Sequence, residues 1–374
     1  MPVHLVLVGG GHAHVEVLRA LGHARPRGVL ITLITREAAS PYSGMLPGAI
    51  AGNYRRGEIE IDMAPLAAFA GAVLVVDEVT ALDPVARLVH RASGPPLPYG
   101  LLSLDIGSRP DVTGVPGARE HAIPVKPIDR FVARFDRLMA DIAAGHVRRI
   151  VLVGGGAGGV ELLLAVAHRM RREGLDVTCT LVASGAVILP GFPDAFRRCV
   201  STALAANGVV VRTGSRVVEV REDAVVLACG AVIAADAVLW TTQASSPAFL
   251  SESGLACDAH GFLQVDATLR AIGHAHIFAA GDMVAFQPRA IAKSGVHAVR
   301  AGPVLAANLI ATLNDTPLRP FAPQRRSLVI LATGGRHAVA TKYGVTLAGD
   351  WVWRWKDRID RRFMARYRPG GLDA

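Results

Sequence analysis

A glycine-rich turn near the middle of the chain has the spacing of a phosphate-binding motif. Gly154-x-Gly156-x-x-Gly159 follows a short apolar stretch and opens a longer one with helical periodicity. In this arrangement the first glycine permits a tight turn, the second lets the backbone approach a pyrophosphate, and the third lets the helix pack closely on the strand. The phosphates then lie at the helix N-terminus. We therefore expect Gly154, Gly156 and Gly159 to bind a dinucleotide.

A second, altered turn lies at the N-terminus. Its spacing is Gly9-x-Gly11-x-x-His14, so a histidine stands where a third glycine is expected. One interpretation is a nucleotide cradle with one changed position, and the other is a metal site on His12 and His14. Side chains two positions apart on a helix point about 200° apart and cannot share a metal, and a catalytic site needs three converging ligands. A second Gly-His-Ala-His at 273–276 leaves a four-histidine site open, but we expect a nucleotide cradle and no metal.

Each turn lies inside a strand–helix–strand pattern. β-Branched runs separated by a periodic helix are typical of βαβ units in a parallel sheet. Two such units, about 145 positions apart, suggest two nucleotide domains in one chain. The sequence therefore predicts an α/β fold with two Rossmann-like dinucleotide-binding domains. The predicted elements are the strands His4–Val8, Val29–Thr35, 148–153 and Val177–Val182, and the helices Ala13–Leu21 and Val160–Met170.

Later landmarks divide the chain. A short strand ends in Gly281-Asp282, a helix is expected over Gly295–Leu313, and prolines at 317, 320 and 323 mark a boundary. We expect a discontinuous first domain (1–112 and 262–316), a second domain (113–261) and a small C-terminal region (317–374). The stretch Pro41–Gly48 is expected to be an irregular loop because it is rich in proline and glycine.

Composition favours a folded chain, and the charge is localised. Hydrophobic residues make up 51% of the 374 residues and charged residues 19%, enough for a large core. Of the net charge of +9, residues 319–374 contribute twelve basic and four acidic side chains. This distribution argues against a chain-wide nucleic-acid groove and favours a tail that meets something anionic. Neither a signal sequence nor an apolar run of the ~18 residues that a spanning helix needs is visible, so we expect a cytoplasmic protein.

The acid that binds a ribose usually follows the second strand of such a domain. Glu37 is the candidate in the first domain. In the second domain the strand ends Val182-Ala183-Ser184-Gly185, with neither an acid for NAD nor an arginine for a 2′-phosphate. The choice between NADH and NADPH therefore stays open.

Longer stretches resemble a known superfamily. The two turns, LDIGSRP at 104–110 and FAAGD at 278–282 resemble, in that order, the FAD-dependent pyridine nucleotide-disulfide oxidoreductases of the two-dinucleotide-binding fold, over nearly all of the chain to about residue 315. Within it, GGVEL at 158–162 and LPGFP at 189–193 look like type II NADH dehydrogenases. Three more stretches resemble the oxidoreductase fused to, or encoded beside, selenide, water dikinase, a subfamily that also has the histidine found here at His14. They are GHAHVEVLR (11–19), PYSGMLPG (41–48) and WVWRWKDRIDRRFM (351–364).

The resemblance implies roles for individual residues. Asp282 would hydrogen-bond the ribityl–pyrophosphate part of FAD, and Lys293 would face the pyrimidine end of the flavin. Lys126 would lie close to the isoalloxazine and Glu161 near the nicotinamide. The plainer alternatives are solvated lysines and an acid that simply favours a helix N-terminus. The expected set is Gly9, Gly11, His12, Ala13, Arg36, Val79, Gly107, Asp282 and Lys293 for FAD, Gly154, Gly156, Gly159 and Ser184 for NAD(P)H, and Glu161, Lys126 and Pro47 for catalysis.

The cysteines suggest how electrons leave the flavin. Cys179, Cys199, Cys229 and Cys257 form no close pair, so we expect neither a structural zinc site nor a local redox disulfide. Disulfide reductases of the superfamily carry a close cysteine pair where this chain reads PYSGMLP. We therefore expect an FAD enzyme that oxidises NAD(P)H and passes electrons directly to a quinone-like acceptor. The alternatives are a redox enzyme of selenium or sulfur metabolism working with selenide, water dikinase, and a non-catalytic dinucleotide sensor.

The C-terminal region predicts an amphipathic helix. At about 100° per residue, six apolar side chains fall on one broad face and four arginines on the opposite side. Trp, Phe and Arg in this pattern fit a helix in a membrane interface, here the inner face of the cell membrane. Packing on the protein's own core, on a second copy in a homodimer or on a partner protein are the alternatives. The apolar face is Trp351, Val352, Trp355, Ile359, Phe363 and Tyr367, and the arginines are Arg354, Arg358, Arg361 and Arg368.

Overall fold

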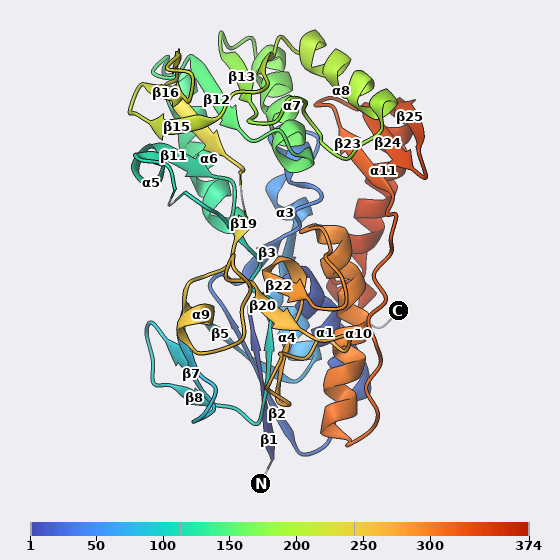
Figure 1. Cartoon of the computed structure of the whole chain (residues 1–374). Coiled ribbons are helices and arrows are strands. Elements are labelled where there is room, and N and C mark those ends of the chain that lie inside the picture. The colour runs from blue at the N-terminus through green and yellow to red at the C-terminus, as the bar shows by residue number, and fades with distance from the viewer. Residues whose placement is uncertain (1, 113, 243, 373–374) are drawn as a thin grey trace.

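Two parallel five-stranded sheets organise the molecule (Figure 1). The computed structural model describes residues 2–112, 114–242 and 244–372. The first sheet has the order β21-β9-β1-β2-β5 and the second the order β11-β18-β12-β13-β14. All their strand pairs are parallel. The predicted α/β fold with two dinucleotide-binding units is confirmed.

The first unit contains the N-terminal third of the chain and a later segment. Its sheet and main helices are β1 (Val3–Val8), α1 (His12–Ala24), β2 (Val29–Thr35), α4 (Met63–Phe69), β5 (Ala72–Val76), β9 (Leu101–Leu104), β21 (Ile277–Ala279), η1 (Gly281–Met283) and α10 (Gly295–Leu313). Smaller elements are β3 (Ala39–Pro41), α2 (Leu46–Ile50), α3 (Arg56–Ile59), β4 (Glu60–Asp62), β6 (Val79–Asp83), β7 (Leu88–Arg91), β8 (Leu97–Pro98), β20 (Leu263–Val265) and β22 (Val284–Phe286).

The second unit and the C-terminal region make up the rest. The second unit has β11 (Ala122–Pro124), α6 (Ile128–Ala143), β12 (Arg149–Val153), α7 (Ala157–Arg172), β13 (Thr178–Val182), α8 (Asp194–Ala206), β14 (Val210–Arg212), β15 (Val217–Val220), β16 (Ala224–Leu227), β17 (Val232–Ala234) and β18 (Ala237–Trp240). Connecting elements are β10 (Arg109–Pro110), α5 (Ala118–His121), β19 (Ala244–Ser245) and α9 (Phe249–Glu252). The C-terminal region has β23 (Val329–Ala332), β24 (Ala338–Lys342), β25 (Val345–Gly349), α11 (Asp350–Ala365) and η2 (Pro369–Gly371).

The strand order reverses at one point in each sheet. From β1 the chain adds β2 and β5 on one side, and later adds β9 and β21 on the other. From β12 it likewise adds β13 and β14 on one side, with β18 and β11 on the other. An open parallel sheet binds ligands outside the carboxyl ends of its strands at such a reversal. The two glycine turns therefore open into the crevices beside β9 and β18.

Local predictions differ in how well they match the elements. The strand Val29–Thr35 and the helix Gly295–Leu313 match residue for residue. The expectation of an irregular loop over Pro41–Gly48 is wrong at its end, because α2 begins at Leu46. Pro47 lies in the first turn of α2, where a missing N–H costs no helical hydrogen bond and the fixed φ suits a helix.

Helix α10 differs from what the sequence suggested about membrane spans. Among the described helices it alone is long and apolar enough to cross a membrane. It packs instead along α1, where a Cβ on Gly302 would lie 2.9 Å from the Cβ of Glu16. Its Asn308 is fully buried and donates hydrogen bonds to the carbonyl groups of Thr268 and Arg319. These are the contacts of a core helix.

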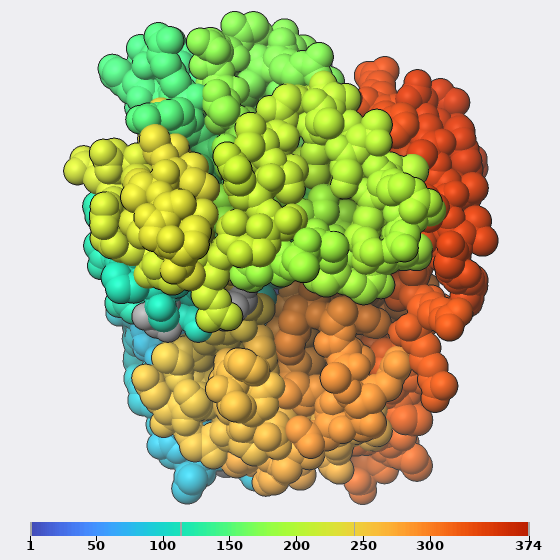
Figure 2. All heavy atoms as spheres, turned by 45° about the horizontal axis from the view of Figure 1, so that its top comes forward, coloured from blue at the N-terminus to red at the C-terminus, as the bar shows by residue number. Residues whose placement is uncertain are grey.

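The C-terminal region runs along one edge of both units (Figure 2). The prediction of a single apolar face on α11 is wrong in part. Val352 and Phe363 are buried, as is Tyr367 just after the helix, whereas Trp351, Trp355 and Ile359 are 48%, 38% and 41% exposed. The prediction failed because helical periodicity does not show where the core lies. The inward face of α11 also includes two charged residues, Lys356 and Asp360.

Candidate functional site

The first turn requires glycine at two positions. Gly9 has φ +96°, and a Cβ there would lie 2.3 Å from the carbonyl oxygen of Asp105. A Cβ on Gly11 would lie 2.3 Å from the Cγ of Asp105. Asp105 directly follows β9, across the crevice from the turn. The turn therefore brings the backbone and the N-terminus of α1 close to the crevice, as a bound pyrophosphate requires.

His14 explains the altered third position of this turn. Its ring is completely buried, with Nδ1 2.7 Å from the carbonyl oxygen of Gly9 and Nε2 2.8 Å from Oγ of Ser103 on β9. Because a carbonyl can only accept, Nδ1–H donates to Gly9 and Nε2 accepts from the Ser103 hydroxyl. Burial lowers the pKa of His14 to about 4, so the ring is neutral at physiological pH. A neutral imidazole thus ties the turn to the neighbouring strand, where a third glycine would allow only close packing.

Asp105 is a residue of this site that the sequence analysis missed. Its Oδ2 accepts hydrogen bonds from the backbone N–H groups of Ala13 (2.7 Å) and His14 (3.1 Å) in the first turn of α1. The carboxyl group is 2% exposed, and burial raises its pKa to about 7. The only feature of the sequence that could have indicated Asp105 is that it is a charged residue inside the apolar stretch LLSLDIG.

The second turn has the geometry that the sequence predicts. Gly154 has φ +132°, and a Cβ there would lie 2.2 Å from Oγ1 of Thr241, just after β18. A Cβ on Gly159 would lie 2.6 Å from the carbonyl oxygen of Gly154, so the helix packs tightly on the turn. Gly156 has no atom within 4 Å of its Cβ position, which leaves the backbone open to a ligand.

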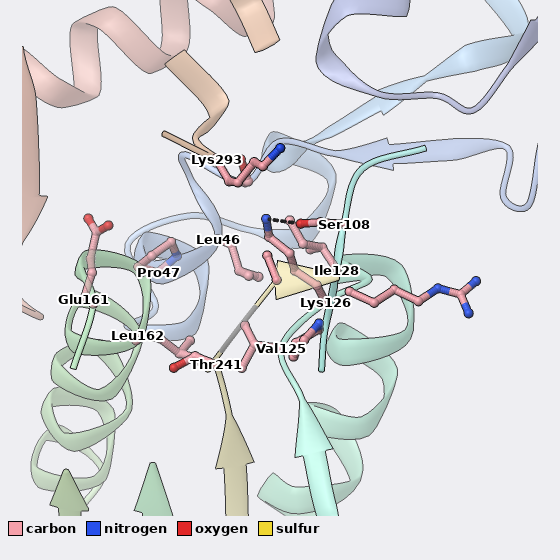
Figure 3. A pocket seen from close by; sticks show the side chains of 17 residues that line it. Leu46, Pro47, Ser108, Val125, Lys126, Ile128, Glu161, Leu162, Thr241 and Lys293 are labelled. Atoms are coloured by element: carbon pink, nitrogen blue, oxygen red, sulfur yellow. Dashed lines mark hydrogen bonds between the residues drawn. The ribbon is translucent and has the colours of Figure 1, made fainter. Parts of the chain in front are cut away.

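One cavity lies beside the second turn, where the two units meet (Figure 3). It has a volume of about 290 Å³ and is lined by residues from both units and from the segment that connects them. Six of the predicted residues line it together, namely Pro47, Lys126, Gly156, Gly159, Glu161 and Lys293. The structure therefore brings one side of each predicted cofactor site to a common space.

Two of the predicted residues contact each other beside this cavity. Lys126 Nζ lies 2.5 Å from Oδ2 of Asp282 and 3.3 Å from Oγ of Ser108. Lys293 Nζ lies 3.7 Å from the centre of the Phe262 ring and donates to the carbonyl of Val284, and burial lowers its pKa. Both lysines are thus held in place, unlike the solvated lysines of the alternative interpretation.

Glu161 belongs to a buried polar network that the sequence did not reveal. Its Oε1 accepts a hydrogen bond from the N–H of Ala332 on β23 (2.8 Å), and burial raises its pKa. Lys356 on α11 donates to Oδ2 of Asp360 (2.6 Å) and to the carbonyl of Gly44 (2.5 Å). Although burial opposes its charge, Asp360 and Glu161 hold the pKa of Lys356 above its ordinary value.

Tyr42 joins this network to the first turn. Its hydroxyl donates to Oδ1 of Asp360 (3.3 Å), and its ring stacks on Phe363 with 4.4 Å between centres. The ring of His12 lies edge-on to Tyr42 at 5.3 Å. His12 and His14 therefore have separate partners. The stretch PYSGMLPG thus supplies the Tyr42 side chain and the Gly44 carbonyl to the network.

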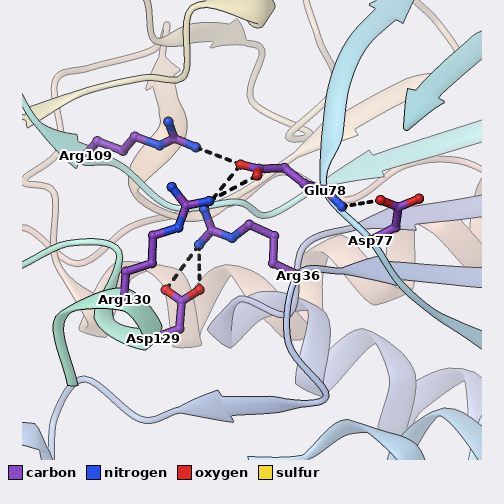
Figure 4. Close-up of polar contacts among 6 residues, drawn as sticks. All are labelled: Arg36, Asp77, Glu78, Arg109, Asp129 and Arg130. Carbon is purple, nitrogen blue, oxygen red and sulfur yellow. Dashed lines mark hydrogen bonds and ion pairs between the residues drawn. The ribbon is translucent and has the colours of Figure 1, made fainter. Parts of the chain in front are cut away.

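The remaining predicted residues lie outside the cavity. Arg36 follows β2 and contacts Asp129 at 3.1 Å (Figure 4). Glu78, one residue before Val79 and β6, contacts Arg109 at 3.4 Å and Arg130 at 3.0 Å. Glu37 is exposed just beyond Arg36, Ser184 is exposed just after β13, and Gly107 follows β9 with φ +69°. All of them follow the carboxyl ends of strands. The ion pair between Arg36 of the first unit and Asp129 of the second links the two units.

Comparisons with known proteins agree with this geometry. Residues 3–302 match the family described as pyridine nucleotide-disulphide oxidoreductase. The NADH dehydrogenase-like protein MT1860 of Mycobacterium tuberculosis is 30% identical over 261 residues, which are 67% of this chain and 65% of that protein. The chain thus spans somewhat less than two thirds of that relative. The demethylphylloquinone reductase NdbB of Synechocystis is 25% identical, over 92% of this chain and 88% of its own.

Solved structures show the same fold. NDH2 from Plasmodium falciparum, in complex with NADH, superposes with a TM-score of 0.82 at 13% identity, over 99% of both chains. The sulfide:quinone oxidoreductase of Aquifex aeolicus has a TM-score of 0.81 at 19% identity, over 100% of this chain and 93% of its own. The two glycine turns and these folds agree with the family match over residues 3–302, which shows that the chain belongs to the pyridine nucleotide-disulphide oxidoreductase family.

Proposed function

We propose that this protein is an FAD-dependent enzyme that oxidises NAD(P)H and reduces a quinone. The observation that carries the proposal is the cavity lined both by Gly156 and Gly159 of the second turn and by Lys293 of the predicted FAD site, which gives a flavin and a nicotinamide a common meeting place. Gly9, Gly11, His12 and Ala13 would hold the FAD pyrophosphate, with Arg36, Val79 and Gly107 toward its adenosine and Asp282 and Lys293 toward its flavin end. Gly154, Gly156, Gly159 and Ser184 would hold NAD(P)H. The names of relatives such as NdbB support a quinone as the acceptor.

The chain itself supplies positioning and protons. Bound FAD accepts a hydride from NAD(P)H and returns two electrons to an acceptor. Lys126 and Lys293 place positive charge at the cavity, which favours negative charge on a reduced flavin. Quinone reduction also consumes protons, and the Glu161–Lys356–Asp360 network holds ionisable groups at the edge of this cavity. Buried groups with shifted pKa values are suited to transferring protons.

Anaerobic stopped-flow mixing with NADH and with NADPH tests the proposal. We expect the oxidised flavin absorbance to bleach with at least one of them and to return after a second mixing with a water-soluble quinone. Return with selenium or sulfur compounds but not with quinones would contradict the quinone assignment and favour the selenium or sulfur alternative. Bound FAD that neither nucleotide bleaches would contradict enzymatic function and favour a sensor.

Direct transfer from flavin to acceptor predicts that the cysteines are dispensable. All four are free thiols, and Cys179 is buried, with its pKa raised by burial to about 12. We expect the variant with all four replaced by alanine to keep its rates of flavin reduction and quinone reduction within about twofold, because no thiol lies on the path. Loss of turnover with intact flavin reduction would contradict direct transfer.

The exposed stripe on α11 is proposed to contact a membrane. Trp351, Trp355 and Ile359 are four residues apart and exposed, and Arg354 and Arg358 lie beside them. Aromatic and basic side chains on the open side of a helix suit the headgroup region of an anionic membrane. The other side of α11 packs against the protein core, so the membrane contact is limited to this narrow stripe.

Replacing Trp351, Trp355 and Ile359 by serine tests that contact. We expect the triple variant to lose most co-sedimentation with anionic liposomes at low salt, because the side chains that would enter the interface are gone. The matched control replaces Val73, Val76 and Val85, which are also exposed, by serine and should sediment like the wild type. Equal sedimentation of both variants, or none by the wild type, would contradict the proposal.

A further inference from the structure

The N-terminus of α1 already has an anionic group built into it. Gly11, the residue before the helix, has no side chain to cap it, and the carboxyl group of Asp105 takes that place from the neighbouring strand. The carboxyl group fits between two glycines. A Cβ on Gly11 would lie 2.3 Å from its Cγ, and one on Gly281 would lie 2.4 Å from its Oδ1. This packing fixes the side chain at the point of the crevice where a helix N-terminus receives phosphate.

The surroundings of Asp105 do not neutralise a negative charge. The groups that lower its pKa are the N–H groups of Ala13 and His14, while burial and the negative charge of Asp282 raise it. The imidazole of His14 is neutral, and so is that of the half-buried His12, because desolvation lowers the pKa of each to about 4. Of the cations that line the cavity, Lys126 is paired with Asp282 at 2.5 Å and Arg109 with Glu78 at 3.4 Å, and Lys293 faces the Phe262 ring.

A pyrophosphate at this helix would place two more negative charges near the same carboxyl group. Like charges at short range in a buried site repel strongly, and the repulsion is relieved when the acid is protonated. We propose that Asp105 takes up a proton from solvent when FAD binds, so that flavin affinity is coupled to the protonation of this one carboxyl group. The proposal rests on the proposed function only in taking FAD as the ligand of the first turn.

The direction of the pH dependence follows from where Asp105 titrates. Before FAD binds its pKa is about 7, and with FAD bound it is higher, so the complex holds an extra proton above that pH. Affinity should therefore be constant below about pH 6.5 and fall above pH 7. One proton taken up per FAD corresponds to a fall of at most about tenfold per pH unit.

Titration of the deflavinated full-length chain with FAD, followed by flavin fluorescence from pH 6 to pH 9, tests the coupling. Calorimetry at pH 7.5 in phosphate and in Tris, which differ in ionisation enthalpy, counts the protons taken up. We expect up to one proton for the wild type, and for Asp105→Asn no uptake and an affinity independent of pH. Asp62→Asn is the matched control, because Asp62 caps α4 through the N–H of Ala64 but is exposed. It should behave like the wild type.

The outcomes separate the two proposals. FAD binding to the wild type with no pH dependence and no proton uptake would overturn the inference and leave the FAD assignment standing. The same slope in Asp105→Asn would assign the proton to another group and also overturn it. No FAD binding at any pH would overturn both proposals. If Asp105→Asn does not fold, the wild type still decides, because infrared difference spectra on adding FAD should gain the C=O stretch of a protonated carboxylic acid, and its absence would contradict the inference.

Discussion

Replacing Gly9 by alanine is expected to weaken flavin binding by roughly 100-fold. Gly9 has φ +96°, a conformation that costs other residues about 1–3 kcal/mol. The new Cβ would also lie 2.3 Å from the carbonyl oxygen of Asp105, a backbone atom that cannot rotate away. The turn must therefore open, and the N-terminus of α1 moves away from the crevice. A penalty of about 3 kcal/mol on the binding geometry corresponds to roughly a 100-fold loss of affinity.

The measurement is flavin content after purification together with the dissociation constant of added FAD. Gly28→Ala is the matched control, because Gly28 also has a positive φ (+68°) but nothing lies within 4 Å of its Cβ position. This control should lose about 1 kcal/mol of stability at most and keep full FAD affinity. Retention of FAD by Gly9→Ala at wild-type affinity would show that the first turn does not hold the cofactor.

Replacing Lys356 by methionine is expected to destabilise the protein and slow the acceptor reaction. The ammonium group donates to Asp360 at 2.6 Å and to the carbonyl of Gly44, and its removal leaves buried carboxylates without a cation. Breaking a buried ion pair on one side costs about 3–5 kcal/mol. The free energy of unfolding from denaturant titration measures this loss.

Two further variants make the test specific. Arg169→Met removes another i,i+4 pair, with Glu173 just after α7 at the surface, and should cost less than about 1 kcal/mol. The double variant Lys356→Met/Asp360→Leu removes both charges and should recover most of the stability. If the network delivers protons to the acceptor, the double variant still reduces its flavin with NAD(P)H at the normal rate but is reoxidised slowly by quinone. Normal reoxidation would assign the network to folding alone.

Much of the fold could be predicted from local pattern. The stretch Val29–Thr35 is a continuous run rich in β-branched residues, without alternation of apolar and polar side chains, and this pattern predicts a buried strand. The helix Gly295–Leu313 lies between Ser294 and Asn314, residue types that are common at helix ends. The glycines at 9 and 154 could be identified because their role depends on a few adjacent residues. The irregular loop expected at Pro41–Gly48 ended earlier than predicted, since proline density does not distinguish a loop from a first helical turn.

The sequence by itself determined the two nucleotide turns, the parallel α/β architecture and the absence of a cysteine pair, because each depends on residues that are close together in the chain. Only the tertiary structure decided which distant residues meet there. Asp105 lies more than ninety positions from the helix it caps, and Lys356 lies 312 positions from the Gly44 carbonyl it binds. Periodicity reports which face of an element is apolar, whereas the energy of a buried charge depends on its neighbours in space. For that reason His14 reads as an irregularity in the motif but is, in the structure, a neutral bridge between the turn and β9.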